Sequence, residues 1–448
     1  MARDASGGAG FEAIRGLIRL LLALFYRRIE VVGLERVPAA GGVIVAANHH
    51  NSVVDAMVLL AIVPRRLRTL AKAQLFQHPL IGPFLRLLGA LPVHRRQEAG
   101  DDPRKNDALF AETTRTLREG GGIIIFPEGR TQPEPVLLEL RTGAARMLLA
   151  AQPAEAALVP AGLVFRKPGI FREGEVLVLF GEPMAVDAHR ALALREPEEA
   201  ARRLTQELTG ALKELIVEAE DLDTLALLEL AEGVDATGGT SIRAGEARLR
   251  WLQEAAARYR RLARAMPERV AALAQRLRAF TAELDAAGLS LHGLARPVSA
   301  AEAAVSALRK ALVLLVGAPL AFAGMLIHGM PYNLIGLVLP WVPHTGEEVA
   351  TNKMAGGLLF YPAFWLLEGW LVWRIGGGAW FVAFLVLLLP SGLVAIAWRE
   401  RLASAARELR GAARRLRAPG LGERLRAERE ALRRELASLA QSSEGTPT

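Results

Sequence analysis

The sequence predicts an α/β domain, with a mostly parallel or mixed sheet and flanking helices, followed by a helical region and C-terminal transmembrane helices. Between residues 43 and 182, short runs rich in β-branched residues alternate with stretches that have a helical hydrophobic period. Such alternation is typical of a sheet covered by helices. Apolar residues are concentrated in 311–398, where several segments approach the length that crosses a bilayer.

Residues 1–30 are predicted to form an amphipathic helix that lies in a membrane interface. The apolar run Leu20–Tyr26 is too short to span a bilayer, and no small-residue cleavage site follows it. Arginines flank a broad apolar stripe, which consists of Phe11, Ile14, Leu17, Ile18, Leu21, Leu24 and Phe25. The alternative is an ordinary amphipathic helix that packs on the domain that follows.

Residues 31–220 are predicted to form the α/β domain itself. Strands are expected at 43–47, 123–126, 158–165 and 176–180, with weaker candidates at 67–73 and 90–93. Helical periods lie between them, after Asp55 and within 80–89, 107–119 and 142–152. Pro160 interrupts its strand, which predicts a bulge or an edge position there.

Residues 221–305 are expected to be helical, and within them 246–285 suggests a long, solvated helical hairpin that carries no chemistry. Residues 306–398 are predicted to hold the membrane segments. The stretches 354–373 and 379–398 are long enough to cross a bilayer, and Arg374 with three glycines between them indicates a tight hairpin. The stretch 311–327 is borderline and 332–342 is too short. The alternative is a buried helical core.

The Arg-rich helical tail, residues 399–448, sets the predicted orientation. Twelve arginines stand against six glutamates in 399–435, so the positive-inside rule places the tail in the cytoplasm. Arg309 and Lys310 place the start of the apolar tract on the same side. An even number of crossings follows, with one hairpin at 354–398, and with 311–342 either re-entrant or forming a second hairpin. We therefore expect an integral membrane protein whose catalytic domain and tail are cytoplasmic.

The amino-acid composition excludes several classes of site and of partner. The chain has no cysteine, which excludes disulfides, thiolate nucleophiles and Cys-based zinc sites. Its net charge of +8 suits phosphate substrates, anionic lipid or nucleic acid. The arginines are interleaved with leucine and alanine, and no nucleic-acid-binding motif is present. Membrane lipid is therefore an expected partner and nucleic acid is not.

The stretch NHHNSVVD, residues 48–55, is the first that carries chemistry. Ser52 and Asp55 form a capping-box-like start to a helix, which gives Asp55 a structural explanation. The functional interpretation pairs Asp55 with His50, four residues lying between them, so that the carboxylate fixes the imidazole tautomer and His50 acts as a base. Spacing selects His50 over His49. A zinc site is the other possibility, but the remaining histidines are scattered, so no metal is predicted.

Two further stretches place charged residues at strand ends. GALPVHRR delivers Arg95 or Arg96, whose guanidinium groups suit an anion, although a solvated charge run is an equally simple explanation. In GGIIIFPEGRT, Glu128 follows a buried strand, Gly129 turns the chain and Arg130 follows. Ligand sites in α/β sheets lie at such strand ends, yet a plain turn would have the same pattern.

In this order the stretches resemble the blocks of the H-x4-D glycerolipid O-acyltransferases, the glycerol-3-phosphate and 1-acylglycerol-3-phosphate acyltransferases. His50 to Asp55 matches the first block, Lys72 to Arg95 the second, FPEG at 126–129 the third and VP at 159–160 the fourth. The resemblance covers about 40–185. It implies an α/β acyltransferase domain in which His50 and Asp55 are catalytic and Glu128 positions the acceptor.

One departure from the family concerns phosphate binding. The family commonly has arginine three residues after the glutamate, whereas Arg130 here is two residues after Glu128 and Thr131 takes the third place. Fungal-type glycerol-3-phosphate/dihydroxyacetone-phosphate acyltransferases are similar in this respect and in having membrane segments after the domain. Arg141, in LLELRTGAARM, stands in the usual lysine place of the block that follows. Candidates for the phosphate are thus Arg95, Lys72 and Arg141, with the role of Arg130 left open, and Gly129 is expected to contact the substrate as well.

The resemblance implies an O-acyltransferase of phospholipid synthesis that needs no cofactor. Its donor would be acyl-CoA or acyl carrier protein, and its phosphate-bearing acceptor would be glycerol 3-phosphate or dihydroxyacetone phosphate. Lysophosphatidic acid or another lysophospholipid is the alternative acceptor. A non-catalytic lipid-binding membrane protein and a metal-dependent phosphohydrolase are alternatives from other classes.

Overall fold

The chain divides into two compact units in the computed structural model. The first comprises Met1–Leu222, Gly245–Gln253 and Thr345–Thr351, and the second comprises Asp223–Ala244, Glu254–His344 and Asn352–Thr448. The structure describes residues 5–77, 81–94, 106–151, 156–236, 245–289, 291, 294, 300–342, 345–418 and 420–442. Each unit is described by itself below.

A mixed sheet forms the centre of the first unit. Its seven strands are ordered β1-β7-β6-β2-β5-β3-β4, and every neighbouring pair is parallel except β6 with β7, as the paired registers show. The strands are β1 Arg28–Val32, β2 Val43–Ala47, β3 Leu67–Lys72, β4 Leu91–Val93, β5 Gly122–Ile125, β6 Ala157–Arg166 and β7 Glu175–Phe180. The central strands β2, β5 and β6 run parallel, so their carboxyl ends meet at one edge of the sheet.

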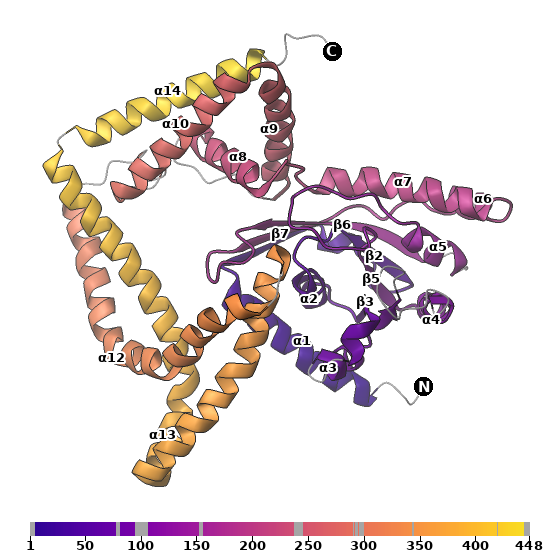
Figure 1. Cartoon of the computed structure of the whole chain (residues 1–448), viewed down its shortest axis with the longest axis horizontal. Helices are drawn as coiled ribbons and strands as arrows, with labels where there is room; N and C mark the ends of the chain where they lie inside the picture. Colours follow the sequence, from indigo (N-terminus) through magenta and orange to yellow (C-terminus); the bar gives the residue numbers. More distant parts are fainter. Residues whose placement is uncertain are drawn as a thin grey trace. The chain divides into compact units, whose positions relative to one another are not determined.

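Helices cover both faces of this sheet (Figure 1). The helices of the unit are α1 Ala5–Phe25, α2 Val53–Ile62, α3 Ile81–Leu87, α4 Asn106–Arg118, α5 Gly143–Ala150, α6 Asp187–Ala193 and α7 Pro197–Leu215. One face packs Ile44, Ala46 and Ile123 into a core with side chains of α4, α5 and α7. Val43 and Val45 are also fully buried but point to the other face, where α1 packs on α2.

The predicted α/β class is confirmed, and all six predicted strands are present. Strand β1 at the sheet edge was missed, because RIEVV alternates only weakly and follows a helix without a turn signal. The prediction for Pro160 is wrong: it lies within β6, between β2 and β7. The missing N–H is tolerated because the pairing with β7 begins one residue later, at Ala161.

Helix α1 packs on the rest of the first unit. Four members of the predicted apolar stripe, Phe11, Ile14, Ile18 and Phe25, are buried, and so is Leu22, which the prediction did not include. Arg15 is buried with them and donates to the carbonyl oxygens of Leu60 and Val63 at the C-terminal end of α2, while Arg19 donates to Ala61 O at 2.9 Å. Basic groups stabilise a helix C-terminus. The structure therefore favours the packed alternative for this stripe over a purely interfacial helix.

The second unit is helical. It contains α8 Leu222–Asp235, α10 Pro267–Ala286, α12 Ala300–Val338 and α14 Leu421–Ser442, together with most of α9 Gly245–Ala265 and of α13 Val349–Arg417. The predicted 246–285 hairpin consists of two helices, α9 and α10, which meet at Met266. The predicted tail at 399–448 is not separate from them, because its helix α14 packs on α10, where Arg276 pairs with Glu428 at 2.8 Å.

Two stretches of the described chain are long and apolar enough to cross a membrane, Val305–Trp341 and Gly346–Arg414. The second has non-helical backbone at Gly377 (φ 76°, ψ −170°), a left-handed conformation that glycine adopts readily. A side chain at Gly369 would meet Phe381 and Phe384 at 3.2–3.3 Å, so the two arms pack on each other, as the predicted hairpin requires. The stretch 311–327 and most of the stretch 332–342, predicted as separate segments, lie in the single helix α12, which ends at Val338 and is followed by the 3-10 helix Leu339–Trp341.

Candidate active site

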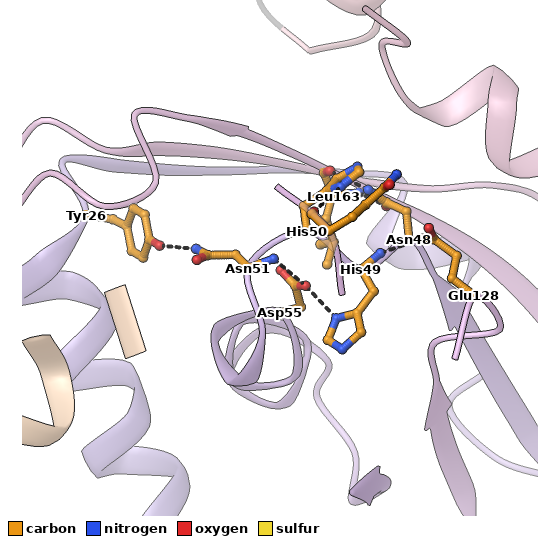
Figure 2. Close-up of polar contacts among 9 residues, drawn as sticks. Tyr26, Asn48, His49, His50, Asn51, Asp55, Glu128 and Leu163 are labelled. Atoms are coloured by element: carbon orange, nitrogen blue, oxygen red, sulfur yellow. Dashed lines mark hydrogen bonds and ion pairs between the residues drawn. The ribbon is translucent and has the colours of Figure 1, made fainter. Parts of the chain in front are cut away.

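The candidate site lies at the carboxyl ends of β2 and β5. His49 follows β2, Asp55 is in the first turn of α2, and Phe126 and Glu128 follow β5. Figure 2 shows the side chains of His49 and Asp55 turned toward one another. His49 Nδ1 is 2.8 Å from Asp55 Oδ2, with Asp55 fully buried and the His49 side chain 14% exposed.

This contact fixes the tautomer of His49. A carboxylate only accepts hydrogen bonds, so Nδ1 carries the proton and Nε2 keeps its lone pair. The ring also stacks on Phe126, with centroids 4.1 Å apart and planes inclined by 14°. An imidazole with one nitrogen held by a buried carboxylate and the other unprotonated is suited to accept a proton from a substrate.

Backbone contacts hold the segment around His49. Glu128 Oε1 accepts the N–H of His49 at 2.8 Å and its Oε2 accepts the N–H of Leu138 at 3.0 Å. Asn48, fully buried, donates to Leu163 O and accepts from Leu163 N, which ties the segment to β6. Glu128 thus uses both carboxylate oxygens to join two loops, whereas the predicted role in positioning an acceptor stays a prediction.

A second chain of hydrogen bonds reaches Asp55 from Tyr26, the residue that follows α1. The N–H of Asn51 donates to Asp55 Oδ2 at 2.9 Å, and Asn51 Nδ2 donates to the Tyr26 hydroxyl at 2.8 Å. That hydroxyl donates in turn to Pro168 O at 3.2 Å. Burial raises the pKa of Tyr26, and the negative charge of Asp55 adds to the effect, so the hydroxyl keeps the proton that this bond needs.

The predicted pairing of His50 with Asp55 is wrong. His50 Nδ1 instead lies 3.2 Å from Gln132 O, so it donates to that carbonyl, and burial lowers the pKa of His50 and favours its neutral form. The physical reason is alternation: adjacent residues of extended chain point to opposite sides, and His49 is in phase with Val43 and Val45. That is the face on which α2 and Asp55 lie.

Helix α2 begins where the sequence predicted, but its first turn is not capped in the predicted way. Ser52 is the N-cap residue of α2, yet its side chain makes no capping hydrogen bond, and its φ of 49° is unusual for a residue other than glycine. The carboxylate of Asp55 takes the N–H of Asn51 instead. Asp55 therefore both starts the helix and holds His49.

Burial makes Glu128 a titrating group near neutral pH. Burial raises its pKa to about 7, against the opposing effect of the two backbone hydrogen bonds. Because the folded protein then binds this proton more tightly than the unfolded chain, Glu128 contributes stability that is complete below its unfolded pKa of about 4.5 and is lost as pH rises to about 7.

We therefore expect the unfolding free energy of the wild type, minus that of Glu128→Gln, to fall by about 2.5 kcal/mol between pH 5 and pH 8. Thermal unfolding of the detergent-solubilised proteins over this range measures it. Glu139→Gln, at an exposed glutamate of the same loop, is the matched control. A difference that grew with pH would contradict the raised pKa.

The predicted anion-binding residues are only partly brought together. Gly129 has φ 69°, and a side chain there would meet Arg141 Nε at 2.7 Å, so the Arg141 guanidinium lies against the turn that follows Glu128. Arg130 and Arg141 are exposed, as is Lys72 at the end of β3. Arg95 lies outside the described residues, as does Arg96.

Several residues of the site were missed by the sequence interpretation. They are Tyr26, Asn48, His49, Asn51 and Phe126, all but His49 and Phe126 buried. A signal existed for His49, because its phase with the apolar residues of β2 can be counted along the sequence. No local signal pointed to Tyr26, since its contact with Asn51 joins residues 25 positions apart.

Several known proteins are similar to part of this chain. A family model described as Acyltransferase matches residues 28–164. The 1-acyl-sn-glycerol-3-phosphate acyltransferase of Bacillus subtilis is 32% identical over 191 residues, which are 42% of this chain and 87% of that protein. Glycerol-3-phosphate O-acyltransferase 2 of Saccharomyces cerevisiae is 33% identical over 131 residues, 28% of this chain and only 18% of the yeast protein. The solved 1-acyl-sn-glycerophosphate acyltransferase of Thermotoga maritima matches at 20% identity with a TM-score of 0.34, over 46% of this chain and 79% of that one.

Proposed function

Since this chain belongs to the glycerolipid acyltransferase family, we propose that it moves a fatty acyl group from a thioester donor to the hydroxyl of glycerol 3-phosphate or dihydroxyacetone phosphate. The observation that carries the proposal is the 2.8 Å contact between His49 Nδ1 and buried Asp55, which leaves Nε2 free as a base. His49 takes the place in the reaction that the sequence interpretation gave to His50.

In the proposed reaction, His49 Nε2 removes the proton of the acceptor hydroxyl as its oxygen attacks the thioester carbonyl. The negative carboxylate of Asp55 stabilises the imidazolium that forms. The tetrahedral intermediate collapses, the C–S bond breaks, and the imidazolium returns its proton to the leaving thiolate. General-base catalysis of this kind contributes about 100- to 10,000-fold. Either acyl-CoA or acyl carrier protein would serve as donor.

Basic residues support a phosphate-bearing acceptor. The Arg141 guanidinium lies exposed beside the Gly129 turn, and Lys72 and Arg130 are exposed after the neighbouring strands β3 and β5, so their charged groups are accessible to a phosphate. Arg95 remains a proposed contributor. Lysophosphatidic acid is the second candidate acceptor, favoured by the name of the Bacillus subtilis relative.

We also propose that the protein is integrated in the membrane through its two long apolar stretches, with the catalytic domain and the Arg-rich tail in the cytoplasm. The acyl chain and the product are both lipid-like, so an enzyme that is held at the bilayer can bind the one and release the other without exposing them to water. A non-catalytic lipid-binding role would leave the oriented His49–Asp55 pair unused.

An acceptor panel tests the proposal. Membranes containing the protein are supplied with a radiolabelled donor, acyl-CoA or acyl-acyl carrier protein, and with one of glycerol 3-phosphate, dihydroxyacetone phosphate or lysophosphatidic acid, and products are separated. We expect label in lysophosphatidic acid or its dihydroxyacetone counterpart. Label only in phosphatidic acid would move the assignment to the second candidate. No transfer to any acceptor, from acyl-CoA or acyl carrier protein, would reject the enzyme.

A further inference from the structure

Helix α12 and the hairpin of α13 carry polar contacts in the middle of apolar segments. His328 of α12 pairs through Nε2 with Leu388 O at 2.9 Å and accepts at Nδ1 from Trp365 Nε1 at 3.2 Å. The two partners stand on opposite arms of α13, before and after Gly377. Polar side chains inside a membrane are costly and mark positions where segments are joined.

The part of α12 up to His328 runs along the second arm of α13. Lys310 pairs with Glu408 at 2.6 Å, Trp398 Nε1 donates to Leu314 O at 2.8 Å, and His328 meets Leu388. As the residue numbers rise along α12 they fall along α13, so the two segments are antiparallel. Gly324, where a side chain would collide with the Ser391 carbonyl, allows the close approach.

The last part of α12, after His328, runs in the opposite direction. His328 is level with Trp365, but Ile335 is level with Gly356, nine residues further from the hairpin tip along the first arm. Those nine residues correspond to about 13 Å of helix. Pro331 lies inside the helix at this change of direction, where a kink is expected. Asn333 Nδ2 donates to Gly329 O at 2.7 Å beside it.

The lengths place this turn half-way across a bilayer. From Gly377 to Trp398 is 21 residues, about 31 Å of helix, which matches the roughly 30 Å hydrocarbon core. Trp370, Trp373 and Trp380 are exposed near the tip, where interfacial tryptophans belong. Leu388, at the level of His328, is 11 residues from the tip, about 16 Å.

We propose that α12 is a re-entrant helix: it enters the bilayer, turns at its midplane on the His328 contacts and leaves on the side from which it came, while the α13 hairpin crosses completely. The inference rests on the membrane integration proposed above and chooses between the two topologies that the sequence left open. Arg309, Lys310 and Arg399 then share the cytoplasmic side, and only Arg374 is at the far tip.

The absence of cysteine makes a cross-linking test clean, because two introduced cysteines have no competitors. A Cβ at Gly356 would be 3.9 Å from the Cβ of Ile335, within the range of about 3.5–4.5 Å found in disulfides. We expect Ile335→Cys/Gly356→Cys to cross-link almost completely in oxidised membranes. The control is Ile335→Cys/Val372→Cys, which a straight α12 would bring together. Cross-linking of that pair alone would overturn the proposal.

Labelling from each side tests the topology independently. In intact spheroplasts of a bacterial host, an impermeant maleimide should modify Ile375→Cys at the tip, but Val342→Cys and Ala403→Cys only after the membrane is opened. Labelling of Val342→Cys from outside would show that α12 crosses, and protection of Ile375→Cys would show that the hairpin does not. Both readouts are independent of acyl transfer. If the predicted cross-link forms in a protein that transfers no acyl group, only the proposed function is rejected. If the protein is active but the cross-link does not form, only the topology is rejected.

Discussion

His49→Ala is expected to reduce acyl transfer by about 1,000-fold or more, while His50→Ala keeps activity within about tenfold of the wild type. His49 alone is held by Asp55 with a free Nε2, whereas His50 donates its Nδ1 proton to the Gln132 carbonyl. Initial rates with labelled acyl-CoA, at saturating acceptor and in membranes matched for protein content, measure the difference.

A more conservative variant separates chemistry from structure. His49→Asn keeps an N–H donor for Asp55 but has no basic nitrogen, so we expect it to fold as the wild type and to be as inactive as His49→Ala. Loss of the His50 hydrogen bond should cost only about 1 kcal/mol of stability. Inactivity of His50→Ala together with full activity of His49→Ala would return the base to His50 and refute the assignment.

Asp55→Asn is expected to lower kcat by about 100- to 10,000-fold, with a much smaller change in the KM of either substrate. The amide can still accept from His49 and Asn51 at the Oδ2 position, but it carries no charge to stabilise the imidazolium. Its NH₂ would take the place of Oδ1, which has no hydrogen-bond partner among the described residues. A buried unpaired donor costs about 1–3 kcal/mol.

The matched control is Asp107→Asn, which changes an exposed aspartate in the first turn of α4. This variant should keep full activity, because the same loss of charge at a helix N-terminus occurs away from the site. Steady-state kinetics of both variants, with thermal unfolding to monitor the fold, make the comparison. A KM effect without a kcat effect in Asp55→Asn would mean that Asp55 acts in binding and not through His49.

Much of the first unit could be predicted because its signals are local. The buried strands are short apolar runs, as in VIVAA and GIII, and the helices between them have a clear period. Strand β1 was missed because it forms by pairing with β7, nearly 150 residues away in the chain, and its own residues do not show a clear strand pattern. The hairpin of α13 was readable from three consecutive glycines between two apolar stretches.

The sequence by itself determined the α/β class, the order of the acyltransferase blocks and the presence of Asp55 at a helix start next to two histidines. Only the tertiary structure decided which histidine that carboxylate faces: the phase of His49 along β2 can be counted in the sequence, but the face of the sheet on which α2 packs cannot. It likewise supplies the observations behind the proposed turn of α12 at His328, since the contacts there come from residues 37 and 60 positions further along the chain. The number of residues between two side chains predicts their separation only where the backbone is regular. Between the histidines and Asp55 the backbone is irregular, because Ser52 has a positive φ.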